Sequence, residues 1–321
     1  MTTYTYRQAV SFGEHRMMLR PREAYDQHLL DAALVIDPVP VDVRWLQDVL
    51  GNSVAVARFD RRATRLSIDS RLRLDHRPGE VQHVDIEDYA RVYPFTYSSE
   101  DMPDLLRSIE RRHHDPQRRI DGWARRFVDP SGRTDTLAML ADMTAAIRRE
   151  FTYVARAEKG TQTPIETLER RKGTCRDYAM LMIEAVRALG FAARFVSGYV
   201  YNPRGARAGA ERPGSERVGG GNTHAWVRVY LPGSGWVEFD PTNGIVGSDG
   251  LIRVAIARDL YQAVPISGTW AGFPGSFIGM DVTVDITVDA ATPVASQRGP
   301  LPPASATAAH HGTDRKEPAP C

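Results

Sequence analysis

The stretch THAWVRVYLPGSGWVEFD, residues 223–240, contains two alternating apolar runs joined by PGSG, a pattern typical of a β-hairpin. Successive side chains of a strand point to opposite faces, so each run has one apolar face. The two apolar faces match when Val229 lies opposite Val237. The same register sets Val227 opposite Phe239, and the pattern therefore predicts how the two strands pair.

This register also predicts which polar side chains share a face. Arg228 lies opposite Glu238, a favourable cross-strand charge pair. Asp240 lies opposite Trp226 and diagonal to His224, within side-chain reach at roughly 7 Å between Cα atoms. A shift of one residue would separate the histidine from the aspartate, and the apolar pattern excludes that shift.

His224 and Asp240 are therefore candidates for a general base and the carboxylate that orients it. A carboxylate beside an imidazole fixes its tautomer and stabilises the imidazolium. The alternative for a single strand histidine is a structural residue with satisfied hydrogen bonds. The pairing with an aspartate, and a cysteine earlier in the chain, favour the catalytic interpretation.

That cysteine lies in GTCRDYAMLMIEAVRALG, residues 173–190. Apolar residues that recur every three or four positions predict a helix with one buried stripe. The stripe comprises Tyr178, Leu181, Met182, Ala185, Val186 and Leu189. Gly190 is placed to end this helix as its C′ residue.

Cys175 falls in the first turn of the predicted helix. Unpaired backbone N–H groups and the helix dipole there favour a thiolate, and the same N–H groups can stabilise an oxyanion. The alternative is a small buried apolar residue, since free cysteines are often buried. Asp177, in the same turn, is expected to support the helix N-terminus rather than to take part in chemistry.

The first 95 residues are predicted to be rich in β-structure. Short alternating runs such as TYTYRQAV, HRMMLR, QHLLDAALVI, SVAVARFD and TRLSIDSRLRL are separated by turn-forming residues. This spacing is typical of an antiparallel sandwich.

From about residue 98 the period becomes helical. Helices are predicted in DMPDLLRSIERRHH, RRIDGWARRFV, TDTLAMLADMTAAIRREF and PIETLERRKG, and strands in AARFVSGYVY and the late MDVTVDITVD. The segment 202–222 is rich in Gly, Pro and Arg, and either a substrate lid or a solvated surface insertion fits it. His113 and His114 have no partners at metal-ligand spacing, so we expect no metal site.

Composition limits the classes of function. Of 321 residues, 41 are Lys or Arg and 40 are Asp or Glu, so no net charge favours nucleic acid or a membrane surface. No run approaches the ~18 apolar residues of a membrane span. Two cysteines make no disulfide framework, and MTTYTYRQAV lacks the apolar core of a signal peptide. We therefore expect a cytoplasmic protein.

The motifs GTCRDYA, HAWVRVYLPGSGW and VEFDPTN, in this order, resemble the bacterial transglutaminase-like superfamily. The resemblance implies a core related to papain-like cysteine proteases, with a catalytic triad of Cys175, His224 and Asp240. It extends to the β-rich first part of the chain, which is similar to the region that often precedes this core in bacteria. The expected architecture is α+β, with a β-rich N-terminal domain at 1–97, a transglutaminase-like core at 98–290 and a disordered tail at 291–321.

The resemblance leaves three functions open. The first is a cysteine amide or peptide hydrolase that acts through a thioester on Cys175, since water is the default acceptor. The second is an acyltransferase that forms or exchanges amide bonds, and the third is a binding module without chemistry. The expected substrate is a peptide, a protein or a small amide, with no metal or organic cofactor.

Overall fold

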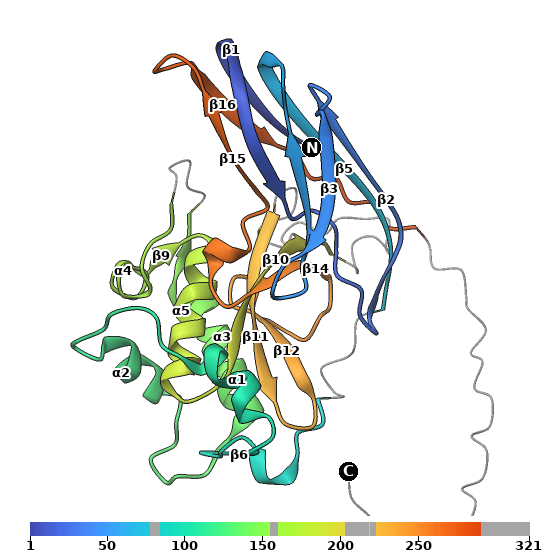
Figure 1. Cartoon of the computed structure of the whole chain (residues 1–321). Coiled ribbons are helices and arrows are strands. Elements are labelled where there is room, and N and C mark those ends of the chain that lie inside the picture. The colour runs from blue at the N-terminus through green and yellow to red at the C-terminus, as the bar shows by residue number, and fades with distance from the viewer. Residues whose placement is uncertain (78–83, 155–159, 203–217, 219–222, 290–321) are drawn as a thin grey trace, which may run out of the picture. The chain divides into compact units, whose positions relative to one another are not determined.

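The structure is a computed structural model that describes residues 1–77, 84–154, 160–202, 218 and 223–289. Contacts group Met1–Val288 into one compact unit, built from helices and mostly antiparallel sheets (Figure 1), which confirms the predicted α+β class. The predicted tail at 291–321, with Cys321, lies outside the described residues, as does the segment 202–222 except for its first residue and Val218.

The N-terminal part of the chain forms an antiparallel sheet around its first strand. The strands are β1 (Thr2–Met17), β2 (Gln27–Asp37), β3 (Asp42–Gln47), β4 (Ser53–Arg58), β5 (Arg62–His76), β15 (Ile266–Ala271) and β16 (Phe277–Val282). One edge of β1 pairs with β5 and then β4, and the other edge pairs with β16 and then β15. The runs TYTYRQAV and HRMMLR, which were predicted as separate strands, thus contribute to the single strand β1. The strand β3 was not predicted.

This sheet takes its strands from both ends of the chain. β15 and β16 fall within the predicted core at 98–290, but they pair with β1. Aromatic rings explain part of this pairing, because Tyr6 makes edge contacts with Phe12, Trp270 and Phe277. The division of the chain at residues 97 and 98 stays a prediction.

A second sheet has the order β13-β12-β11-β10-β14. Its strands are β10 (Ala193–Val200), β11 (Thr223–Leu231), β12 (Gly235–Asp240), β13 (Ile245–Val246) and β14 (Leu251–Ala257). The register of β11 and β12 is the predicted one, with Val227 opposite Phe239 and Val229 opposite Val237. The charge pair Arg228–Glu238 is also present, at 3.1 Å.

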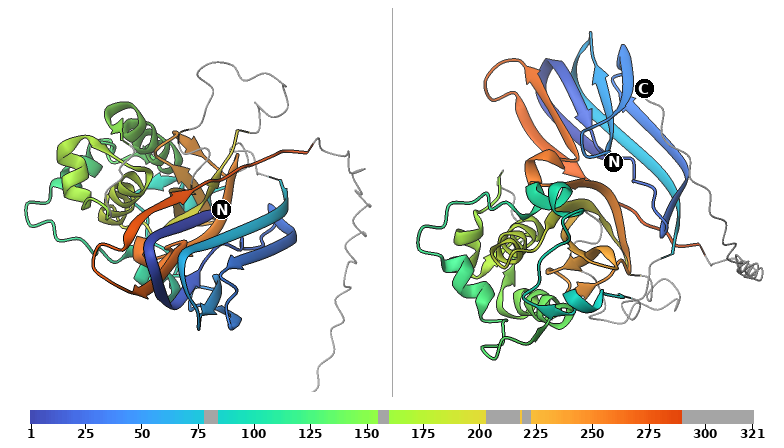
Figure 2. Two further views of the ribbon diagram at one scale, coloured as in Figure 1. Left: turned by 90° about the horizontal axis from the view of Figure 1, so that it is seen from above. Right: turned by 60° about the horizontal axis from the view of Figure 1, so that its bottom comes forward.

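Five helices accompany this sheet in the described part of the chain: α1 (Met102–Ile109), α2 (Arg119–Arg125), α3 (Thr136–Glu150), α4 (Pro164–Arg170) and α5 (Cys175–Ala188). Figure 1 shows α5 between the sheet and the helices α2 and α4, also drawn in Figure 2, whereas α3 and α1 contact the sheet themselves. The shorter elements are η2 (Asp88–Ala90), β6 (Val92–Tyr93), β7 (Thr134–Asp135), β8 (Thr152–Tyr153), β9 (Lys172–Gly173) and η3 (Leu260–Gln262). None of the helices in these described ranges is long and apolar enough to span a membrane.

Helix α5 is buried on nearly every side. The predicted stripe is buried, but so are Met180, Ile183, Glu184 and Arg187. The stripe prediction therefore understated the burial, because the sheet covers one face of α5 and other helices cover the rest. The helix ends as predicted at Gly190, whose φ is +90°, in a Schellman arrangement of hydrogen bonds from residues 190 and 191.

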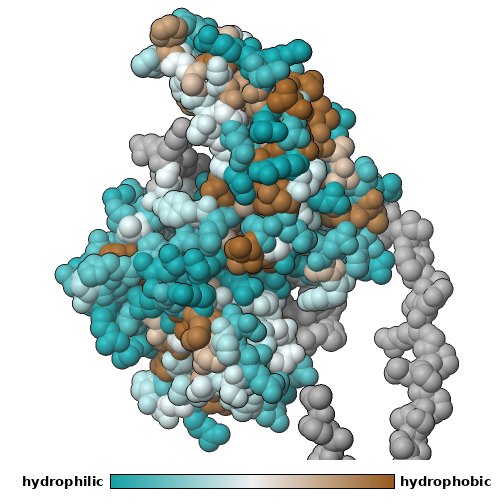
Figure 3. All heavy atoms as spheres, viewed as in Figure 1, coloured by the Kyte–Doolittle hydropathy of each residue, from teal (hydrophilic) through white to brown (hydrophobic). Residues whose placement is uncertain are grey.

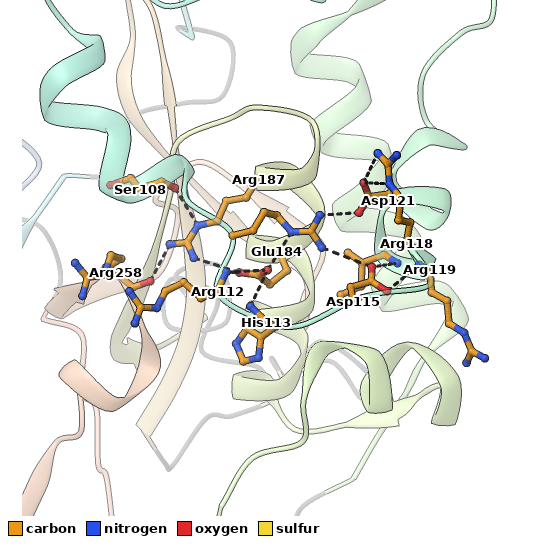
Figure 4. Close-up of polar contacts among 12 residues, drawn as sticks. Ser108, Arg112, His113, Asp115, Arg118, Arg119, Asp121, Glu184, Arg187 and Arg258 are labelled. Atoms are coloured by element: carbon orange, nitrogen blue, oxygen red, sulfur yellow. Dashed lines mark hydrogen bonds and ion pairs between the residues drawn. The ribbon is translucent and has the colours of Figure 1, made fainter.

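A buried ion pair fixes the second half of α5 (Figure 4). Glu184 accepts hydrogen bonds from Arg111 Nε at 3.2 Å and from two backbone N–H groups of the segment that follows α1. Arg187 lies 3.3 Å from Glu184 and donates to the carbonyl oxygens of Ser108, Ala193 and Arg258. These contacts connect the second half of α5 to α1, β10 and the chain before η3.

Two buried amide side chains of the first sheet cover the free edge of β14. Gln27 accepts from the backbone N–H of Arg253 at 2.9 Å and donates to its carbonyl at 2.8 Å. Asn52 likewise accepts from the backbone N–H of Ile256 at 2.9 Å and donates to its carbonyl at 2.8 Å. Because each amide replaces one residue of a neighbouring strand, the edge of the second sheet is closed to other strands.

Apolar side chains also gather on the surface. Figure 3 shows apolar patches over the region where β2, β3 and β5 lie in Figure 1. The exposed apolar residues of these strands include Leu30, Val35, Val43 and Trp45. Nothing in the structure shows what covers them.

We predict that Glu184→Gln destabilises the protein by about 3–5 kcal/mol, because it leaves two arginines facing a neutral group in a buried site. Chemical denaturation measures the loss. Glu169→Gln is the matched control: Glu169 pairs with Arg119 at the surface, where such a pair contributes no more than about 1 kcal/mol. Equal effects of the two substitutions would contradict the importance of the buried pair.

Candidate active site

Cys175 is the first residue of α5 and is 7% exposed. The helix begins at Thr174, whose backbone N–H and hydroxyl donate to Asp177 Oδ2 at 2.8 and 2.9 Å. Asp177 also accepts from the backbone N–H of Gln162, so it supports the helix N-terminus as predicted. No described residue accepts a hydrogen bond from the backbone N–H of Cys175, which leaves that donor for an oxyanion.

The predicted histidine and aspartate meet in the second sheet. His224 Nε2 lies 2.8 Å from Asp240 Oδ2, and both side chains are fully buried. The other ring nitrogen, Nδ1, has no partner of normal hydrogen-bond geometry among the described residues. Cys175 is the second group that interacts with this imidazole and favours its protonated form. The structure thus brings together all three residues that the sequence singled out.

The electrostatics of the pair favour its charged form. Burial by itself lowers the pKa of His224, but the charge and hydrogen bond of Asp240 and the interaction with Cys175 outweigh it and raise the pKa to about 10. Burial by itself raises the pKa of Asp240, but His224 and hydrogen-bond donors hold that pKa below its ordinary value. The imidazole is therefore an imidazolium at neutral pH.

Four donors hold the Asp240 carboxylate. Oδ1 accepts from the backbone N–H groups of Thr242 and Asn243, at 2.9 and 3.3 Å. Oδ2 accepts from Asn243 Nδ2 at 2.8 Å in addition to His224. The turn that follows β12 is thus part of the site. Its closure requires Gly244, with φ +66°, whose N–H donates to Asp240 O.

Asn243 connects this carboxylate with two further segments. Its side chain accepts from the backbone N–H of Val218 at 2.8 Å and donates to the carbonyl of Val218 at 3.1 Å. Its own carbonyl accepts from Arg148 of α3. The sequence does not reveal this role of Asn243, because an asparagine in a turn is common and its long-range partners are not visible in the sequence.

The imidazole is also held by packing. Its ring is stacked on Trp226, with ring centroids 6.0 Å apart and an interplanar angle of 26°. Gly198 lies opposite His224 on β10, and a Cβ there would come 2.7 Å from Trp226 and 2.0 Å from Ile252 O. Only glycine permits this close approach, so Gly198 fixes the position of Trp226 and thereby of the histidine.

Tyr153 is a further neighbour that the sequence analysis did not identify. Burial, followed by the charges of Cys175, Asp177 and Asp240, raises the pKa of its phenol to about 12, although Arg176 acts in the opposite direction. Its side chain is 37% exposed and packs edge-on against Tyr178. Tyr153 therefore lies beside the site with part of its surface open to solvent.

A metal centre does not compete with this assignment in the part of the chain that the structure describes. No group of three or more His, Cys, Asp or Glu side chains there could hold a metal ion. His113, one of the two histidines examined in the sequence, instead donates its backbone N–H to Glu184.

Comparison with known proteins matches the chain to two family models. Residues 123–241, which include the cysteine, the histidine and the aspartate, match the transglutaminase-like superfamily. Residues 1–75 match the bacterial transglutaminase-like N-terminal region. The chain belongs to the transglutaminase-like superfamily.

Three proteins show what this transglutaminase-like protein is similar to in sequence or in fold. "Uncharacterized protein Rv2569c" of Mycobacterium tuberculosis is 28% identical over 278 residues, which are 83% of this chain and 84% of that protein. "Uncharacterized protein YebA" of Bacillus subtilis is 37% identical over 76 residues, only 10% of its length. The crystal structure of "a Putative Cysteine Protease from Cytophaga hutchinsonii" has a TM-score of 0.62 and 19% identity, and the match covers 90% of both chains. This last similarity supports the fold alone.

We predict that Asp240→Asn lowers the pKa of His224 well below about 10, since burial is then opposed only by the interaction with Cys175. NMR titration of the imidazole measures this change. A pKa that stays near 10 in the variant would show that Asp240 is not the group that keeps the ring protonated.

The same pKa shifts predict how stability depends on pH. The folded-state pKa of His224 is raised, so its contribution is complete below pH 6.5 and is lost as the pH rises towards about 10. The folded-state pKa of Asp240 is lowered, so its contribution is complete above pH 3.8 and is lost on acidification below that value. Denaturation of Asp240→Asn should lack the alkaline loss that the wild type shows.

We predict that Asn243→Ala destabilises the protein by about 1.5–3 kcal/mol, the range for hydrogen bonds to a charged group. Thr242→Val is the matched control in the same turn, because its hydroxyl is buried without a hydrogen-bond partner among the described residues and its backbone N–H remains. Chemical denaturation compares the two variants. A loss in Thr242→Val as large as that in Asn243→Ala would assign the effect to the turn rather than to the amide.

Proposed function

We propose that the chain is a cysteine-dependent amide or peptide hydrolase that acts through a thioester on Cys175. The observation that carries the proposal is the position of His224, which bonds to Asp240 through Nε2 and keeps Nδ1 for the thiol. A nucleophile, a base and a group that orients the base are thus present in one buried site.

In the first half of the reaction, Cys175 thiolate attacks the carbonyl carbon of the amide and forms the C–S bond. The imidazolium of His224 favours the thiolate, and the free backbone N–H of Cys175 is a donor to the oxyanion. When the tetrahedral intermediate collapses, the C–N bond breaks. The proton of His224 passes to the leaving amine, and the acyl group remains as a thioester.

In the second half, the neutral imidazole takes a proton from water as the water oxygen attacks the thioester. The C–S bond then breaks, and the thiolate and the imidazolium are restored. The sum is one amide and one water converted into one carboxylic acid and one amine. An amine in place of water would give a new amide by the same steps, which is the acyltransferase alternative.

The buried hydrogen bond between His224 and Asp240 argues against the third alternative, a binding module without catalytic chemistry. A buried charged pair is costly to form, and a module that only binds would gain nothing from a protonated imidazole beside a thiol. We place the reaction in the cytoplasm, because a chain with two cysteines and no disulfide framework fits a reducing compartment.

We predict that Cys175→Ala abolishes amide turnover and leaves the fold intact, because the thiol is small. The assay incubates the protein with a panel of acyl donors and measures a thioester adduct on Cys175 by intact mass. Cys321→Ser is the control and keeps the reactive thiol. Turnover that survives in Cys175→Ala would rule out the thioester mechanism, and incorporation of an added primary amine would favour the transferase.

A further inference from the structure

The strand β8 lies next to the start of the helix that carries the nucleophile. β8 and β9 pair in parallel, with Thr152 opposite Lys172 and Tyr153 opposite Gly173. Cys175 follows Gly173 after one residue, so a single short strand separates β8 from the thiol.

One residue of β8 makes no backbone hydrogen bond to β9. Thr152 donates its N–H to Arg171 O at 2.8 Å, and Val154 donates to Gly173 O at 3.0 Å. In a parallel ladder with these two bonds, the N–H and C=O of the residue between them point to the other side. The backbone N–H and C=O of Tyr153 are thus directed away from β9, and no described residue bonds to them.

The free edge of β8 lies within a limited distance of Cys175. Adjacent strands are about 4.8 Å apart, and two residues span at most about 7.6 Å, so the Cα atoms of Tyr153 and Cys175 lie within about 12 Å. An extended peptide covers that distance with three or four residues at about 3.3 Å each.

Packing makes the edge rigid. A Cβ on Gly173 would lie 2.9 Å from Asp177 Cβ and 3.2 Å from Tyr178 Cε1, so β9 lies directly on the first turn of α5. The rings of Tyr153 and Tyr178 are 6.4 Å apart, which connects β8 to the same turn. A peptide bound along β8 is therefore aligned to the helix that carries the nucleophile.

We propose that the edge of β8 binds the acyl donor as an extended peptide, with the N–H and C=O of Tyr153 paired to one substrate residue. This inference rests on the proposed function and names its substrate class, a peptide or protein segment rather than a small free amide. Main-chain hydrogen bonds from an added strand give affinity without regard to side chains. The phenol of Tyr153 is 37% exposed and offers a further surface to substrate side chains.

The substrate side of the proposal is tested with N-methylated peptides. The probe is an acetylated eight-residue peptide that forms a thioester on Cys175 of the wild type, as measured by intact mass. N-methylation is then moved along its backbone. We expect kcat/KM to fall about tenfold at the residue that pairs with Tyr153 and not at its direct neighbours, because neighbouring N–H groups of a strand point to opposite sides.

The protein side is tested by comparing Tyr153→Pro with Tyr153→Ala. Both lose the phenol, but only proline loses the outward N–H, and proline is tolerated where an edge N–H makes no ladder bond. We expect kcat/KM for the peptide to be about tenfold lower in Tyr153→Pro than in Tyr153→Ala. With a small acyl donor such as a simple acetyl amide or ester, the two variants should react alike.

The outcomes separate this inference from the function on which it rests. A uniform effect of N-methylation along the peptide, or equal rates of the two variants with the peptide, overturns strand addition at β8 and leaves the thioester mechanism standing. Failure of every acyl donor to modify Cys175 in the wild type overturns the proposed function itself. If Tyr153→Pro does not fold, the N-methylated series on the wild type decides alone.

Discussion

The register of β11 on β12 is the constraint on which the site depends. Side chains alternate along a strand, so a shift of one residue would turn either His224 or Asp240 to the opposite face. The apolar residues that pack against α5 forbid such a shift, since Val227, Val229 and Phe239 are fully buried. A requirement of the core thus fixes the geometry of a buried polar pair in the same hairpin.

The nucleophile depends on a separate set of contacts. Cys175 is positioned by the turn that begins α5, and α5 is held by burial on nearly all sides and by the Glu184–Arg187 pair. Its partner His224 is positioned by the sheet. The site therefore forms where α5 and the sheet meet in one shared core, and each is also tied to its other neighbours by buried hydrogen bonds.

The first sheet contributes to the same rigidity without contributing to the site. Gln27 and Asn52 occupy the free edge of β14. Arg253 of β14 bonds to Asp26 and lies 3.0 Å from Glu238 of the hairpin, which in turn pairs with Arg228. A chain of buried charges thus connects the N-terminal sheet to the hairpin that carries His224 and Asp240. The position of β15 and β16 on β1 adds a second connection between the two ends of the chain.

The amino-acid sequence by itself determined one helix with its C-terminal end and the register of one hairpin. The alternation in residues 223–240 fixed the pairing of β11 with β12, and the period of residues 173–190 fixed the helix and its end at Gly190, because both depend on contacts between residues close in the chain. Only the tertiary structure decided which nitrogen of His224 bonds to Asp240, that Asn243 reaches Val218, and that strands from the far end of the chain complete the first sheet. Those choices depend on partners tens to hundreds of residues away, whose approach is set by packing and leaves no periodic trace in the sequence.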